Sequence, residues 1–218
     1  MLHALQKQLT DLYQVDTAYQ IDDFLITDPG LAKRLGANVM LADTDETVLL
    51  SEDDDGMSLS VFLDEDLLQR LAERDPLRRL RAGHLSDLWT VIEGVSHFIC
   101  LVFRAQRETA VTLLELEMQA EVDKFVGTWL LAVQQDDTEL AERLHGWLFD
   151  DVRFHPDLSR DQHERYRAAN DYAGRFCHGL QKRLQDGTSV GVSELRHFYR
   201  LTQTDKISHI HSRAWSAS

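Results

Sequence analysis

The chain has 218 residues, of which 43% are hydrophobic and 28% are charged, and its formal net charge is -14. This composition is that of a globular protein able to bury a core, and it excludes an intrinsically disordered chain. The length fits one structural unit, in which residues 1–76 supply helices and a β-hairpin that pack on a helical bundle of residues 77–218.

The N-terminal segment is predicted to be helical. Apolar residues recur every three or four positions within residues 2–19, which is the spacing of one helix face. A second, short helix is expected after Asp28, because Asp is a favoured N-cap and Pro29 suits the first helical position. Gly36 should end this helix.

A β-hairpin is the clearest strand signal in the sequence. Residues 47–50 form a short apolar run, and apolar residues alternate with Ser and Phe over residues 57–63. The Asp55-Gly56 pair between them is typical of a hairpin turn. Residues 39–42 can add a third strand, and we expect a helix over residues 65–73 to cover the sheet.

From residue 77 onward the sequence favours helices, and the predicted fold class is mainly α. One helix runs to about Arg104, and the next begins at Thr112, which forms a capping box with Glu115. Residues 98–114 are also rich in β-forming residues, so a hairpin of strands there remains an alternative. A further helix is capped by Ser159 with Gln162 three residues later.

Two of these predicted helices carry pairs of chemically active side chains one turn apart. Glu93 and His97 share one face of the first helix, and Glu117 and Glu121 share one face of the second. If the helices pack as a hairpin, all four side chains meet, as ligands do in di-metal carboxylate bundles. The sequence therefore predicts a divalent metal or acid–base site at these four residues, or else a polar salt-bridge network.

An acidic segment after residues 39–42 resembles a known catalytic motif. Asp43-Thr-Asp45-Glu-Thr47 is similar to the first motif of haloacid-dehalogenase-type phosphatases, in which the first Asp is a nucleophile and the second an acid/base. The resemblance covers about nine residues, and the chain has no series of βα units, so we expect an acidic loop. Residues 51–62 do not fit a calcium-binding loop, because Ser51 and Phe62 stand at its first and twelfth positions.

Charge is divided unevenly along the chain. Residues 1–151 hold 12 Lys and Arg against 30 Asp and Glu, a difference of -18, whereas residues 152–218 hold 11 against 7, a difference of +4. The acidic part argues against nucleic-acid binding, because phosphates would be repelled. The basic part favours contact with the acidic part, within the chain or in a homodimer, or with an anionic ligand. The residues predicted for anion or partner binding are Arg167, Arg175, His178, Arg196, Arg200 and Lys206.

The sequence shows no signal peptide, membrane span or strong catalytic motif, and our expectations for location and function rest on this. Residues 1–20 lack the apolar core of a signal peptide, and Asp87, Glu93 and His97 interrupt the most apolar window, so we expect a cytoplasmic protein that does not contact a membrane. Cys100 and Cys177 lie in apolar patterns and are expected to be buried thiols. Without a strong catalytic motif, the favoured function is a non-enzymatic interaction or regulatory protein. The alternative is a metal-dependent or acid–base enzyme.

Overall fold

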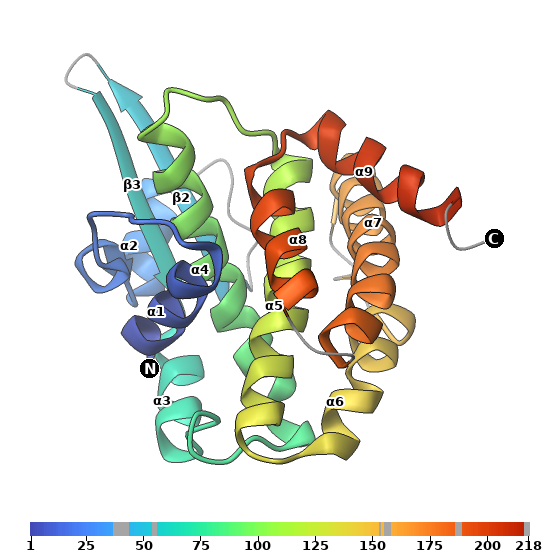
Figure 1. Cartoon of the computed structure of the whole chain (residues 1–218). Helices are drawn as coiled ribbons and strands as arrows, with labels where there is room; N and C mark the ends of the chain where they lie inside the picture. Colours follow the sequence, from blue (N-terminus) through green and yellow to red (C-terminus); the bar gives the residue numbers. More distant parts are fainter. Residues whose placement is uncertain (37–43, 54–55, 153, 155–157, 186–188, 216–218) are drawn as a thin grey trace.

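The computed structural model describes residues 1–36, 44–53, 56–152, 154, 158–185 and 189–215 (Figure 1). Within these residues the fold is mainly α with a small sheet, which confirms the predicted class. The helices are α1 Leu2–Tyr13, α2 Pro29–Leu35, α3 Glu65–Glu73, α4 Leu85–Ala105, α5 Leu113–Gln134, α6 Thr138–His145, α7 Arg160–Gln185, α8 Ser189–Arg200 and α9 Gln203–Trp215, and the strands are β1 Leu25–Ile26, β2 Glu46–Asp53 and β3 Gly56–Leu63.

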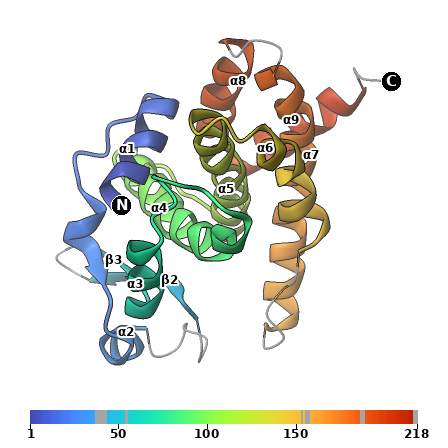
Figure 2. The same ribbon diagram turned by 90° about the horizontal axis from the view of Figure 1, so that it is seen from below.

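Helix α5 is the central element of the bundle. It packs on α4 along one side and on α7 along another, and Figure 1 shows it between them. Because neighbours surround it, α5 buries charged and polar residues as well as apolar ones. This central position, which Figure 2 shows from below, explains why Glu117 and Lys124 are buried although charged side chains usually face solvent.

The connection between α4 and α5 settles the alternative at residues 98–114. Helix α4 continues to Ala105, so the hairpin of strands considered there is wrong. Thr112 caps α5 as predicted, because its Oγ1 accepts a hydrogen bond from the backbone N–H of Glu115 at 3.1 Å. The Glu115 carboxylate does not close the capping box but binds Arg104. Ser159 and Gln162 do form the predicted capping box before α7.

The sheet is mixed rather than a bare hairpin. Strands β2 and β3 form the predicted antiparallel hairpin, with Val48 opposite Val61, and β1 adds a short parallel strand on the other side of β3. The third strand considered at residues 39–42 and the hairpin turn at residues 54–55 lie outside the described residues. Helix α4, rather than α3, makes the main helical contact with β2 and β3.

Two basic residues of α8 join the C-terminal helices to α1. Arg196 donates a hydrogen bond to the carbonyl of Leu12 at 2.7 Å, and Arg200 donates to the carbonyls of Tyr13 at 2.9 Å and Gln14 at 3.1 Å. These carbonyls end α1 and have no partner within the helix, so the arginines satisfy them. The basic end of the chain thus contacts the N-terminal part through backbone oxygens. One hydrophobic core extends from Leu2 to Ile210.

Helix α4 also bears on the membrane prediction. Residues Ala82–Ala105 are long and apolar enough to cross a membrane by length and composition, contrary to the expectation from the charged residues in this window. Of the most apolar 18-residue window, 78% is buried inside the protein, which is the behaviour of a core helix. The pattern of burial therefore accounts for the apolar composition of α4 without a membrane.

Candidate metal centre

A group of charged side chains, some buried and some partly buried, lies where α4, α5 and β2 meet. Glu93 and His97 project from α4, and Glu117 and Lys124 project from α5. Glu46, the first residue of β2, completes the group from the sheet. We call these residues, together with Glu121 of α5 and Arg165 of α7, the Glu/His cluster.

His97 stands between carboxylates from two elements. Its Nδ1 lies 3.3 Å from Oε1 of Glu46, and its Nε2 lies 3.8 Å from Oε2 of Glu117. The side chain is 9% exposed, and Nε2 is buried without a hydrogen-bond partner among the described residues. A buried ring nitrogen without a partner is unfavourable, so this atom is available to a proton acceptor or a ligand.

Lys124 bridges the two helices. Its Nζ lies 2.6 Å from Oε2 of Glu93 and 2.8 Å from Oε1 of Glu121. Burial opposes the charge on Lys124, but the two carboxylates outweigh it and raise the pKa of the lysine. Glu121 is therefore held by an ion pair rather than presented as a free ligand.

The carboxylates of the cluster differ in their affinity for protons. Burial raises the pKa of Glu117 to about 7 and also raises the pKa of Glu46. Burial acts on Glu93 in the same direction, but Lys124 and His97 outweigh it and lower the pKa of Glu93. Burial opposes the charge on His97, yet Glu46 and the other carboxylates raise the pKa of the imidazole to about 9.

Three members of the cluster form a geometric metal site. One ligand atom each from Glu46, Glu93 and His97 lies within 4.8 Å of the other two. First-row metal ions hold nitrogen and oxygen ligands about 2.0–2.2 Å away, so a small closure of these side chains would bring all three into coordination range. The nitrogen of His97 that faces Glu46 is Nδ1, which leaves Nε2 directed toward Glu117.

The structure thus brings the four residues predicted from the helix faces into one cluster but gives them different surroundings. Glu93 and His97 contribute to the geometric metal site, Glu117 lies on the opposite ring nitrogen, and Glu121 binds Lys124. That these residues bind a metal remains a prediction. Glu46 was not among the predicted site residues. Its position at the start of the predicted hairpin was the only local feature that could have pointed to it.

Helix α7 contributes two further residues that were not predicted. Nε of Arg165 lies 3.6 Å from Oε1 of Glu117. Burial raises the pKa of the Tyr166 phenol, and Glu117, Glu93 and Glu46 raise it further, as expected for a phenol close to three carboxylates. Both side chains are partly exposed, so they lie between the cluster and solvent.

The residues predicted to bind an anion or partner fall into two separate places. Arg167, Arg175 and His178 line a cavity on α7. Arg196 and Arg200 bind carbonyls of the α1 end, and Lys206 is fully buried with its Nζ 2.6 Å from Oε1 of Gln119. They therefore do not form a single surface.

Other predicted features have simpler outcomes. Cys100 and Cys177 are free and buried, as predicted. Asp43 of the phosphatase-like motif lies outside the described residues. Searches for a matching protein-family model, a similar curated protein and a similar solved structure found none, so the function is inferred from the geometry of this chain.

Proposed function

We propose that the Glu/His cluster binds one divalent first-row metal ion and that the protein carries out metal-dependent acid–base chemistry there. The observation behind this proposal is the convergence of ligand atoms from Glu46, Glu93 and His97 within 4.8 Å, with His97 buried and the two carboxylates partly buried. A mixed set of imidazole and carboxylate ligands suits Mn, Fe or Zn better than Mg or Ca, which prefer oxygen alone.

The charges in the cluster support a cation. With His97 protonated, the cluster holds four carboxylates and three cationic side chains, which leaves one unit of negative charge if every carboxylate is ionised. A divalent ion bound to neutral His97 would bring the same side chains to neutrality. The members are Glu46, Glu93, Glu117 and Glu121, with His97, Lys124 and Arg165.

Lys124 is compatible with a metal ion on Glu93. The lysine uses only Oε2 of Glu93, and a carboxylate has a second oxygen that can act as a ligand. Glu117 would then accept a hydrogen bond from Nε2–H of His97 and keep Nδ1 free for the metal. A carboxylate in this position is the usual partner of a metal-bound histidine.

The proposed chemistry follows from the protein groups around the ion. Three protein ligands leave coordination positions for water or substrate, and a bound ion lowers the pKa of such a water. In the metal-free protein, burial raises the pKa of Glu117 to about 7, so this carboxyl can hold or release a proton near neutral pH. Arg165 and Tyr166 lie at the edge of the cluster, where they can contact a substrate that enters from the α7 side.

Metal analysis of protein purified without a histidine tag tests the proposal. Elemental analysis of the isolated protein, followed by titration of the chelated protein with Mn²⁺, Fe²⁺ and Zn²⁺, should give one ion per chain. His97→Gln and Glu46→Gln should each weaken binding strongly, whereas Glu139→Gln should not, because Glu139 is 82% exposed and forms only a surface pair. Circular dichroism establishes that each variant is folded. No binding by folded wild-type protein, or equal binding by all variants, overturns the proposal.

The uneven charge supports a second candidate, the protein-interaction function in the cytoplasm, with another protein or a second copy as partner. Its basis is the formal net charge, which is -18 for residues 1–151 and +4 for residues 152–218. Sedimentation at low and high salt tests it, because exposed charge contacts between chains weaken as the screening length shortens. A monomer at every salt concentration would argue against the homodimer.

A further inference from the structure

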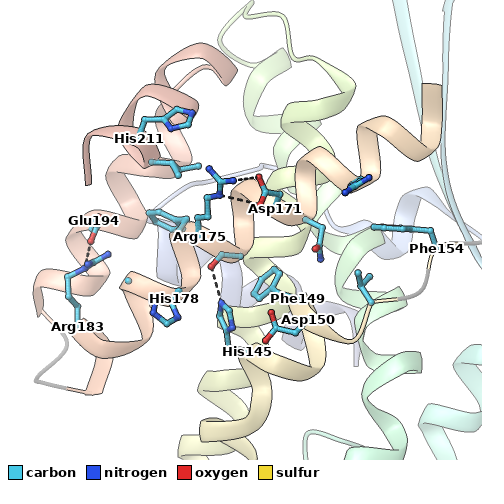
Figure 3. Close-up of a pocket in the computed structure, with 17 residues that line it drawn as sticks. His145, Phe149, Asp150, Phe154, Asp171, Arg175, His178, Arg183, Glu194 and His211 are labelled. Carbon is cyan, nitrogen blue, oxygen red and sulfur yellow. Dashed lines mark hydrogen bonds and ion pairs between the residues drawn. The ribbon is translucent and has the colours of Figure 1, made fainter. Parts of the chain in front are cut away.

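A cavity of about 800 Å³ lies along α7 in the C-terminal part of the molecule (Figure 3). Its walls also come from the π-helical turn Gly146–Asp150, from α8 and from α9. Figure 3 shows Phe154 at one end and the Arg183–Glu194 pair at the other, with Arg175 and Asp171 between them. The volume is in the range of small-molecule sites, which measure about 300–1,000 Å³.

The cavity combines an apolar lining with charged groups. Phe149, Phe176 and Ile210 are buried in its floor, and Phe154 adds an aromatic side chain at the end. Gly174 permits the close approach of Phe149 to α7, because a Cβ there would lie 3.2 Å from the Phe149 ring. This floor can take up a flat apolar group, since burial of aromatic surface is favourable.

The charged residues are spaced along one face of α7. Arg167, Asp171, Arg175 and His178 follow one another at intervals of three or four residues. Arg175 binds Asp171, with Nη2 2.8 Å from Oδ2, and Arg183 binds Glu194, with Nε 2.5 Å from Oε2. These pairs neutralise two carboxylates but leave further N–H groups on both arginines.

Arg167 is different from the other two arginines. It forms no hydrogen bond or ion pair with any residue that the structure describes, although it lines the cavity. His178 and His211 add two ring side chains that can donate hydrogen bonds. Asp150 also lines the cavity and forms no ion pair with an arginine among the described residues. Within the described part of the chain, Arg167 therefore offers the cavity N–H groups that no protein acceptor occupies.

The cavity is separate from the Glu/His cluster. Arg165 contacts Glu117 of the cluster, whereas Arg167 lines the cavity. Two residues along a helix correspond to a rotation of about 200°, so the two arginines point to opposite sides of α7. Binding in the cavity can therefore be measured independently of metal binding.

We propose that this cavity binds a small organic anion, in which a carboxylate or phosphate is joined to a flat apolar group. The anion would contact Arg167 and the free N–H groups of Arg175, and the apolar group would lie on Phe149 and Phe176. Arginine is the residue best suited to hold either anion, because its planar donors match both. A carboxylate and a phosphate would use the same cavity residues. Binding measurements decide which of the two anions is preferred.

Calorimetric titration with 2-naphthoate, 2-naphthyl phosphate and neutral 2-naphthol tests this site in metal-free protein. We expect at least one of the anions to bind more tightly than 2-naphthol by about tenfold or more, because a charge-assisted hydrogen bond contributes to its binding. Whichever anion binds more tightly identifies the preferred group. Inorganic phosphate alone should bind more weakly, since it does not occupy the apolar floor.

Two matched variants locate the site. Arg167→Gln should weaken binding of the anions by about tenfold and leave 2-naphthol unchanged. Arg160→Gln removes the same charge from the same helix, but Arg160 is 89% exposed and lies outside the cavity, so binding should not change. The proposal is overturned if neither anion binds at millimolar concentration, if 2-naphthol binds as tightly as both anions, or if the two variants have equal effects. His97→Gln should leave anion binding intact, so the metal proposal can fail without affecting this one.

Discussion

Gly94 of α4 lies against Glu46 of β2, and this contact holds the sheet beside the proposed metal centre. A Cβ on Gly94 would lie 3.3 Å from Cγ of Glu46, 3.2 Å from Cδ2 of Leu63 and 3.3 Å from Cγ1 of Val61. These distances are shorter than most Cβ contacts, so a methyl group here would push the side chains of the hairpin away from α4. Glu46 therefore reaches His97, although 51 positions separate the two residues in the chain.

We predict that Gly94→Ala displaces the hairpin. The added methyl group should lower the free energy of unfolding by about 1–3 kcal/mol, despite the higher helix propensity of Ala. It should also weaken metal binding, because Glu46 moves away from His97. Denaturant unfolding and metal titration measure the two effects. Gly127→Ala in α5 is the control, since its nearest contact is Ile92 Cδ1 at 3.4 Å. Similar losses in both variants would show that the effect is not specific to this contact.

The stability of the metal-free protein should fall as the pH rises toward 9. The pKa of His97 is raised from 6.5 to about 9 in the folded state, so the folded protein holds this proton more tightly than the unfolded chain. The stabilisation is complete below pH 6.5 and is lost as the pH passes about 9. Its size is on the order of 1–3 kcal/mol.

Chemical unfolding at a series of pH values, with a chelator present, measures this dependence. The pKa of Glu117 is raised from 4.5 to about 7 in the folded state, so this carboxyl also stabilises the protein at low pH. Its contribution to stability is lost as the pH rises from 4.5 to 7. His97→Gln should remove the loss of stability near pH 9, and the Glu117 part of the curve should move to higher pH, because His97 lowers the pKa of Glu117. A wild-type curve that rises over pH 6.5–9 would contradict the proton affinity assigned to His97.

Replacement of Lys124 should cause a large loss of stability that a metal ion partly restores. Lys124→Met leaves Glu93 and Glu121, which are 19% and 16% exposed, without their cation, and the loss should approach about 3–5 kcal/mol, the cost of breaking a buried pair. Mn²⁺ or Zn²⁺ should raise the melting temperature of this variant more than that of the wild type, because the ion replaces the missing charge. Lys7→Met is the control: its pair with Asp11 is exposed, at 64% and 65%, and such pairs contribute about 0–1 kcal/mol. A small loss in both variants would show that the Lys124 bridge is weak.

Replacement of Arg200 tests whether the basic C-terminal residues make contacts within one chain or between two chains. Arg200→Ala removes hydrogen bonds to the carbonyls of Tyr13 and Gln14, and we expect a loss of about 1–3 kcal/mol without a change in sedimentation. Arg79→Ala, at an exposed position, should change neither quantity. Dissociation of a dimer on replacement of Arg200 would instead support a contact between chains.

Several features were predictable because they depend on local spacing. Helical periodicity places Glu93 with His97, and Glu117 with Glu121, whatever the rest of the fold does. The caps at Asp28, Thr112 and Ser159 are likewise local, since each joins a side chain to a backbone group three residues away. The short loop between α4 and α5 then makes these helices antiparallel neighbours.

The tertiary structure decided which of these side chains share a site. Glu46 enters the cluster because the hairpin packs against Gly94, and Glu121 is withdrawn from it because Lys124 binds both Glu121 and Glu93. The cavity on α7 likewise needs the chain after α6 and the helices α8 and α9 to close around one helix face. Sequence spacing determines the face of a helix on which a side chain lies. It does not determine what packs on that face, because this depends on the combined fit of many residues distant in the chain.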